Sequence, residues 1–118
     1  MSRNVNLTGS FRFAIEGVKI AIKKEPNFRI HLSILLSVLF ISLFLNLTSF
    51  EWFSLLITGA FVLTMELFNT AIEAIVDIVS PEFHEKAKIA KDVSAAAVLI
   101  SAIFAIAIGI AVLLPKIF

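Results

Sequence analysis

A chain of 118 residues in which 59% are hydrophobic and 16% are charged is too apolar for an ordinary soluble domain, and this composition predicts an all-α membrane protein. The chain has no cysteine, which excludes disulfide bonds, thiolate metal sites and cysteine nucleophiles. Its net charge of +1 neither indicates nor excludes a polyanionic partner until the charges are placed along the chain.

Residues 5 to 24 form the first predicted element, an amphipathic helix that lies on the membrane surface. Apolar side chains recur at i, i+3, i+4, i+7 and i+11, with charged side chains between them. The apolar series is Phe11, Ala14, Ile15, Val18 and Ile22, and the charged series is Arg12, Glu16, Lys19 and Lys23. The first long apolar run begins only near residue 30, so we expect no cleavable signal peptide.

Three later stretches are apolar and long enough to cross a bilayer, which takes about 20 residues. They are residues 30–47, 52–79 and 93–114, and they predict three transmembrane helices in a single membrane domain that comprises residues 1–118. Lysine and arginine cluster in residues 1–29, which include Arg3, and in residues 80–92, but not between the first two spans. By the positive-inside rule, we expect a multi-pass protein of the cell membrane with a cytoplasmic N-terminus and a cytoplasmic 80–92 loop.

The second predicted span carries a polar stripe within the segment "MELFNTAIEAIVD". At about 100° per residue, its four polar side chains share an arc of roughly 80° on one helix face. They are Glu66, Asn69, Glu73 and Asp77. Counted from Trp52 at about 1.5 Å per residue, Glu66 stops about 9 Å short of the inner interface, and the two later acids reach it.

A carboxylate at the depth of Glu66 is costly in lipid and predicts a functional site, where it suits a general base. The alternative, simple solvation at a helix end, applies best to Asp77. Twelve phenylalanines are interpreted as lipid-facing bulk.

Other charged groups are expected at the same cytoplasmic level. Glu25 precedes the first span, and "HEKAKIAKD" supplies His84, Lys88, Lys91 and Asp92 before the third. Glu25 and Glu73 are oxygen ligands suited to Mg²⁺, which typically takes one or two carboxylates plus phosphate oxygens. Lys91 is suited to neutralise phosphate, although a lysine that snorkels from a helix start fits the same pattern.

Glycine stands only at positions 9, 17, 59 and 109, which excludes a P-loop or a dinucleotide-binding loop. Any nucleotide must therefore be held through metal and side chains. By themselves, His84 and His31 are interpreted as a surface residue and an interface residue.

The third span carries small residues every four positions, a ridge that allows close helix packing. The ridge consists of Ala97, Ser101, Ala105 and Gly109. Since three spans do not enclose a polar pocket alone, we expect a homo-oligomer that shares sites between neighbours.

"ELFNTAIEAIVD" followed by "PEFHEKAKIAKDVSAAAVL" closely resembles the signature of the small prokaryotic diacylglycerol kinase and undecaprenol kinase family. The resemblance implies a bacterial homotrimer of three-span protomers that transfers the γ-phosphate of MgATP to a membrane lipid alcohol. It implies no nucleic-acid partner. "EPNFRIH" at 25–31 looks more like the undecaprenol kinase branch, and Ser94 and Ala95 stand where a Gly-Ser pair is common, so we favour a polyprenol over diacylglycerol.

The same resemblance implies a role for each matching residue. Glu66 looks like the general base, with Asn69 beside it in the catalytic pair. Glu25 and Glu73 look like the metal ligands. The nucleotide-binding residues would be Glu25, Glu73, Asp77, Glu82, His84, Lys91 and Asp92, and the lipid substrate would meet Phe28, Arg29 and Glu66.

Two other functions fit a buried acid. A small proton- or cation-coupled transporter would use Glu66 as its carrier, but it leaves the acid and lysine cluster before the third span unexplained. A non-catalytic packing subunit would tolerate leucine at Glu66.

Overall fold

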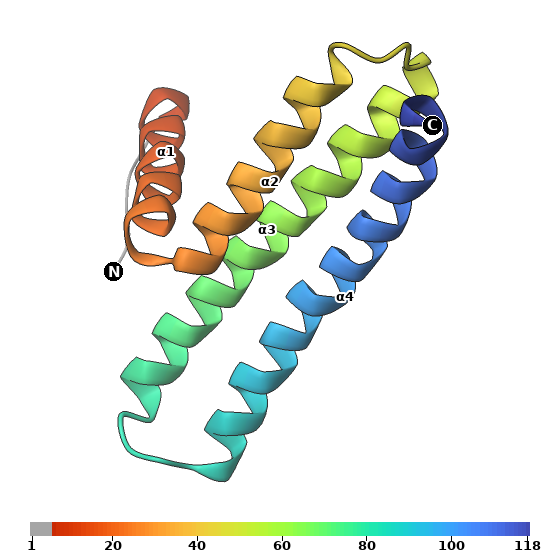
Figure 1. Ribbon diagram of the computed structural model, residues 1–118. Coiled ribbons are helices and arrows are strands. Elements are labelled where there is room, and N and C mark those ends of the chain that lie inside the picture. The colour runs from red at the N-terminus through yellow and green to blue at the C-terminus, as the bar shows by residue number, and fades with distance from the viewer. Residues whose placement is uncertain (1–5) are drawn as a thin grey trace.

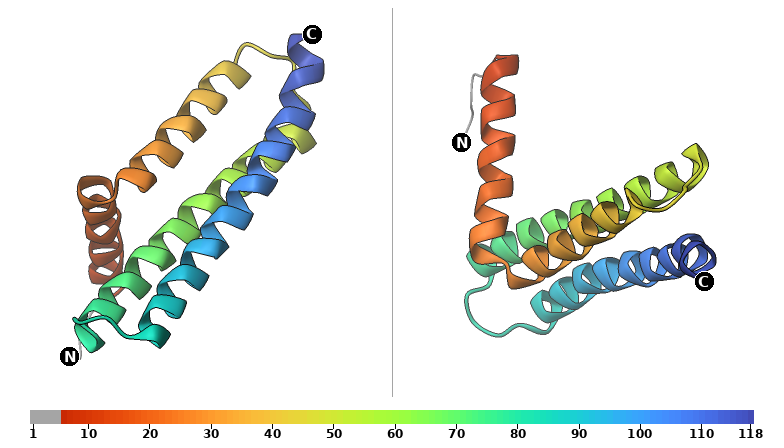
Figure 2. Two further views of the ribbon diagram at one scale, coloured as in Figure 1. Left: turned by 60° about the horizontal axis from the view of Figure 1, so that its bottom comes forward. Right: turned by 45° about the horizontal axis from the view of Figure 1, so that its top comes forward.

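The computed structural model describes residues 6–118, which form four α-helices and, within that range, no strand (Figure 1). The helices are α1 (Leu7–Lys24), α2 (Pro26–Ser42), α3 (Ser49–Val79) and α4 (Glu85–Ile117). Helices α2, α3 and α4 lie side by side as an antiparallel bundle, and α1 leaves the bundle at a steep angle (Figure 2). The predicted all-helical fold is thus confirmed.

Helix α1, the predicted surface helix, begins at Leu7, because the side chain of Asn6 caps it by accepting a hydrogen bond from Gly9 N at 2.9 Å. The first residue of its predicted range, Val5, and the basic residue Arg3 lie outside the described residues. Its apolar residues are exposed, Phe11 by 64% and Ile15 by 55%, as expected for a helix whose apolar face meets lipid.

The ends of the other helices differ from the predicted spans. Helix α3 begins at Ser49 because Thr48 and Glu51 form a capping box, with hydrogen bonds of 2.9 and 3.2 Å. The loop predicted at 80–92 extends only to residue 84, since His84 Nδ1 accepts a hydrogen bond from Lys86 N at 3.1 Å and starts α4 at Glu85. Helix α4 therefore begins eight residues before the apolar run that was predicted to start at residue 93.

Helices α3 and α4 are each long and apolar enough to cross a membrane. Helix α2 is also apolar, but it ends at Ser42 and has 17 residues, or about 26 Å of helix against a hydrocarbon core of about 30 Å. The run predicted to 47 is cut short because the chain turns after Leu43. The count of three transmembrane helices stays a prediction.

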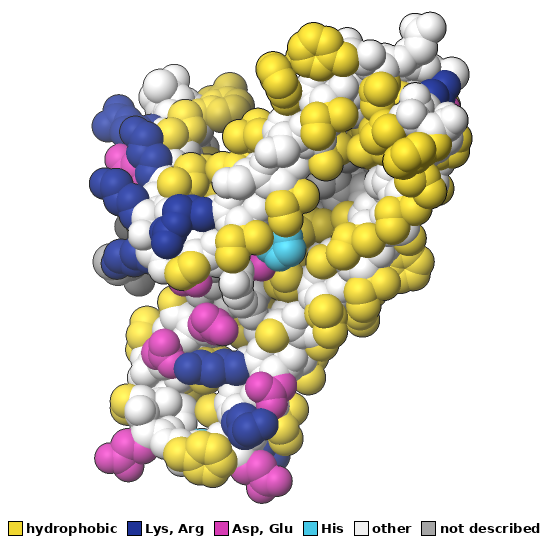
Figure 3. All heavy atoms as spheres, in the orientation of Figure 1, with side chains coloured by type: hydrophobic (Ala, Val, Ile, Leu, Met, Phe, Trp, Pro, Cys, Tyr) yellow, Lys and Arg dark blue, Asp and Glu magenta, His cyan; other side chains and the backbone are white. Residues whose placement is uncertain are grey.

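Apolar side chains cover most of the bundle surface (Figure 3). Charged side chains gather on α1 and at the end of the bundle where α3 turns into α4. The interior between the helices is thin, and its buried apolar residues include Leu55, Val62 and Val98. A surface of this kind is suited to contact with lipid or with further helices rather than with water.

A rigid corner joins α1 to α2. Glu25 alone separates the two helices, in an extended conformation (φ −111°, ψ 102°) that a residue before proline favours. Its N–H donates to Ala21 O at 2.9 Å. The Arg29 guanidinium donates to the last carbonyls of α1, Ile22 O at 2.8 Å and Lys23 O at 3.0 Å, while Phe28 is buried.

Candidate functional site

The carboxyl group of Glu66 is buried inside the bundle. The residue is 3% exposed, and its Oε1 lies 3.2 Å from His31 Nε2 on α2. Side chains on a helix lean toward its N-terminus. Because α2 and α3 run in opposite directions, His31 and Glu66 lean toward each other, and the two groups meet between the helices.

Two further carboxylates surround this pair. Glu25, at the corner between α1 and α2, and Glu73, two turns along α3, both interact electrostatically with Glu66. Both are partly exposed. Within residues 6–118 no group of three or more His, Cys, Asp or Glu side chains is placed to hold a metal ion by protein ligands alone. The arrangement is an acidic cluster with one buried member.

A lysine extends the cluster toward the turn between α3 and α4. Lys91 Nζ lies 2.6 Å from Asp77 Oδ1 and also interacts with Glu73. The hydrogen bond to Asp77 raises the pKa of the Lys91 ammonium group, which precedes the predicted third span. Lys91 therefore stays charged at neutral pH, and two acids and a cation face each other across α3 and α4.

Asn69 is held from α4 by a serine. Ser94 Oγ is buried and lies 2.6 Å from Asn69 Oδ1 and 2.9 Å from Lys91 O. A hydroxyl group donates one proton, so it serves one of these acceptors at a time. The contact fixes Asn69 one turn from Glu66 on the polar face of α3.

The structure thus brings most of the predicted stripe together, but not every predicted residue joins it. The side chain of His84 caps α4, and Asp92 pairs with Lys88 at 2.6 Å on the exposed surface. Glu82 is exposed in the short turn. Phe28 and Arg29 stabilise the corner next to Glu25, where the buried Phe28 presents little surface to a lipid.

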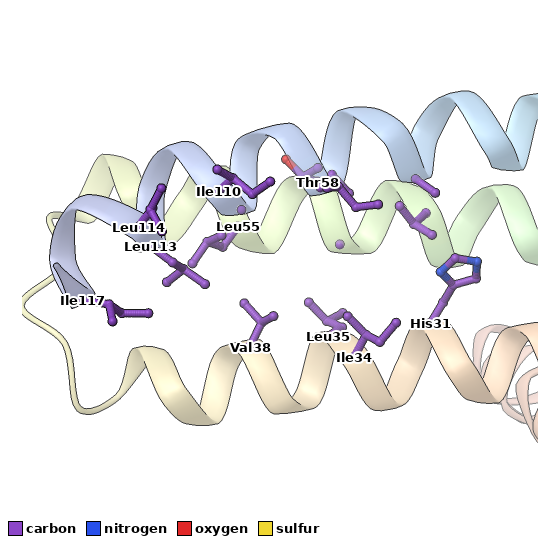
Figure 4. A pocket seen from close by; sticks show the side chains of 16 residues that line it. His31, Ile34, Leu35, Val38, Leu55, Thr58, Ile110, Leu113, Leu114 and Ile117 are labelled. Carbon is purple, nitrogen blue, oxygen red and sulfur yellow. The ribbon is translucent and has the colours of Figure 1, made fainter.

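An apolar cavity of about 390 Å³ lies between α2, α3 and α4 and ends at His31 (Figure 4). Leu35, Leu55 and Ile110 are among the side chains that line it, one from each helix. Ala105 and Gly109 of the predicted ridge line the same cavity, and Ser101 is buried. Of the four ridge residues, only Ser101 is buried within the chain.

The sequence interpretation missed the contacts of His31 and Ser94. Both lie on helices other than α3, and a stripe on one helix cannot show its partners on another. A signal for His31 was present, since it lies at the cytoplasmic start of the first predicted span, near the expected depth of Glu66. For Ser94 the signal was a polar residue one turn beyond Lys91.

Sequence comparison relates the chain to known proteins. The family model described as prokaryotic diacylglycerol kinase matches residues 12–113. A diacylglycerol kinase of Synechocystis sp. is 43% identical over 111 residues, which are 93% of this chain and 63% of that protein. An undecaprenol kinase of Bacillus subtilis is 38% identical over 109 residues, 91% of this chain and 87% of that protein. A diacylglycerol kinase of Escherichia coli K12 is 35% identical over 95 residues, 80% and 77% of the two chains.

Proposed function

Because the chain belongs to the prokaryotic diacylglycerol kinase family, we propose that it transfers the γ-phosphate of ATP to the hydroxyl group of a membrane lipid alcohol, with Glu66 as the general base. The observation that carries this proposal is the position of Glu66. Its buried carboxyl group lies between an apolar cavity that ends at His31 and an open cluster of acids and a lysine. A lipid and a nucleotide are expected to approach from these two sides.

The reaction follows from that position. Glu66 accepts the proton of the lipid hydroxyl, the alcohol oxygen forms a bond to the γ-phosphorus, and the bond from that phosphorus to the bridging oxygen of ADP breaks. Phosphoryl transfer asks the protein for orientation and charge stabilisation more than for covalent chemistry. Asn69, held by Ser94, helps to orient the reacting groups.

The nucleotide is placed at the cytoplasmic end of α3 and α4. Lys91 offsets phosphate charge, and Asp77 keeps its ammonium group in place. Glu25 and Glu73 fit Mg²⁺, since both are partly exposed carboxylates near Glu66, and this ion typically binds one or two carboxylates plus phosphate oxygens. When bound, the ion would neutralise phosphate charge. Glu82, His84 and Asp92 complete the proposed nucleotide site from the turn and the first turns of α4.

The lipid class and the assembly belong to the same proposal. "EPNFRIH" at 25–31 favours a polyprenol over diacylglycerol, and offering labelled ATP with each lipid separately to the purified protein distinguishes them.

We place three spans in the membrane with the N-terminus and the α3–α4 turn in the cytoplasm, and three copies in the assembly. The exposed apolar side chains of α2, α3 and α4 support both placements. The comparisons give no support to a transporter or a packing subunit.

The test of the base is Glu66→Gln, which keeps the size of the side chain and removes its basicity. We expect a fall in ATP-dependent lipid phosphorylation of about 10²- to 10⁴-fold, the usual contribution of general base catalysis. The control is Glu16→Gln on the exposed face of α1, which should retain activity. Near-normal turnover in a folded Glu66→Gln protein would refute the assignment, and unchanged circular dichroism and elution volume show that the fold is kept.

A further inference from the structure

We propose that His31 is a positioning residue for Glu66, whose Oε1 lies 3.2 Å from His31 Nε2. In this proposal Nε2 carries a hydrogen and donates a hydrogen bond to Oε1, which leaves Oε2 directed toward the lipid hydroxyl. This inference rests on the proposed role of Glu66 as base. It concerns a residue that the polar stripe of α3 does not include and that comes from a different helix.

The contact is the main restraint on the carboxyl group. Among the side chains of residues 6–118, His31 alone lies within ion-pair distance of Glu66, at 3.2 Å. A glutamate side chain has three rotatable bonds, so an unrestrained carboxyl group spends little time in one productive orientation. One donor on Oε1 selects an orientation and leaves the second oxygen free.

The charges around Glu66 make this donor more important. Glu25 and Glu73 are both acids and repel the negative charge of Glu66, whereas His31 opposes that repulsion. Lys91, the lysine of the cluster, pairs with Asp77 instead. Without His31, the Glu66 carboxyl group would keep two negative neighbours and lose the one ion-pair partner that it has among residues 6–118.

The position of the ring links the base to the apolar cavity. The side chain of His31 is 25% exposed, compared with 4% for Glu66, and it stands at one end of the cavity (Figure 4). A lipid whose tail lies in the cavity would carry its hydroxyl group past this ring. The imidazole would therefore bind Oε1 close to the point where the lipid hydroxyl group arrives, and Oε2 would remain free to accept its proton.

Three substitutions separate the donor from the ring. In His31→Gln the amide nitrogen reaches about as far as Nε2, in His31→Asn it stops about where Nδ1 lies, and His31→Leu keeps bulk without a donor. We expect kcat to fall about 10- to 100-fold in the Asn and Leu variants, the usual effect of removing a partner that orients a functional group. His31→Gln should recover most of kcat, and the KM for ATP should stay unchanged in all three.

Leu36→Ile is the control on the same helix, since Leu36 is exposed, does not line the cavity and has no ion-pair contact to Glu66. Equal kcat in His31→Asn and the unmodified protein would overturn the inference, and so would equally low kcat in folded Asn and Gln variants. If His31→Leu does not fold, the comparison of His31→Asn with His31→Gln still tests the inference. Activity that survives in Glu66→Gln contradicts the proposed role of Glu66 as base, whereas loss there with a normal His31→Asn contradicts only this inference.

Discussion

Lys91 and Asp77 show why a short ion pair need not be a stabilising one. Their nitrogen and oxygen are 2.6 Å apart, but both side chains are open to solvent, 39% and 65% exposed. Exposed pairs contribute little to folding, because solvent screens the charges and ordering two long side chains costs entropy. We therefore expect this pair to matter for nucleotide binding, through its electrostatic interaction with the phosphates, more than for the stability of the fold.

Lys91→Met tests this interpretation at the residue scale. We expect kcat/KM for ATP to fall about tenfold or more, because a cation next to the phosphates is lost. The thermal unfolding temperature should change little. Steady-state kinetics at varied ATP, with a melting curve for the same preparation, measure both quantities.

The control for Lys91→Met is Lys86→Met, which removes the same charge from an exposed position on the first turn of α4. Because the pKa of Lys91 is raised above its ordinary 10.5, the contribution of its charge is fully present below that value and is lost only as the pH rises through the raised pKa. The effect of Lys91→Met should thus be the same at about pH 6 and about pH 9. A loss seen equally in Lys86→Met would show a non-specific effect of net charge.

At the scale of the helices, α2 packs on α3 where the Leu35 side chain meets Gly59. A Cβ atom at Gly59 would overlap Leu35 Cδ1 and lie 3.0 Å from Leu35 Cδ2. The missing side chain therefore allows α2 to pack closely on α3, which holds His31 within reach of Glu66.

Gly59→Val should force the Leu35 side chain out of its position and destabilise the protein by about 1–3 kcal/mol, the usual cost of overpacking. Because the obstructing atoms belong to Leu35, Gly59→Val with Leu35→Ala should recover part of the loss. Chemical unfolding in detergent micelles measures the free energy of unfolding of the unmodified protein, the two single variants and the double variant. Additive effects of the two substitutions would mean that the two positions do not share a contact.

At the scale of the whole molecule, one chain offers a surface on which large apolar side chains are exposed on every helix. Three copies of a 13.0 kDa chain correspond to a particle of about 39 kDa. Native mass spectrometry of the protein released from nanodiscs should detect this trimer. When the protein is separated by size, the fractions with lipid kinase activity should contain the trimer. Full activity in fractions that hold single chains would contradict the proposed assembly.

The sequence predicted the helices and the polar stripe because both are periodic along the chain. Glu66, Asn69, Glu73 and Asp77 are spaced at helical intervals, and that spacing alone places them on one face. The contacts His31–Glu66 and Ser94–Asn69 depend on how helices pair in space, which composition and period do not encode. The helix ends at Ser42 and Glu85 depend on local turns and caps, which apolar runs do not report.

The corner at Glu25 couples the orientation of α1 to the position of a carboxylate of the proposed site. Because a single residue separates α1 from α2, the two helices have little freedom to change their relative tilt. If α1 lies on the membrane surface as predicted, we expect a bilayer of different thickness or curvature to change its tilt and to move the Glu25 carboxylate with it. The lipid environment would then act mechanically on the position of a charged group.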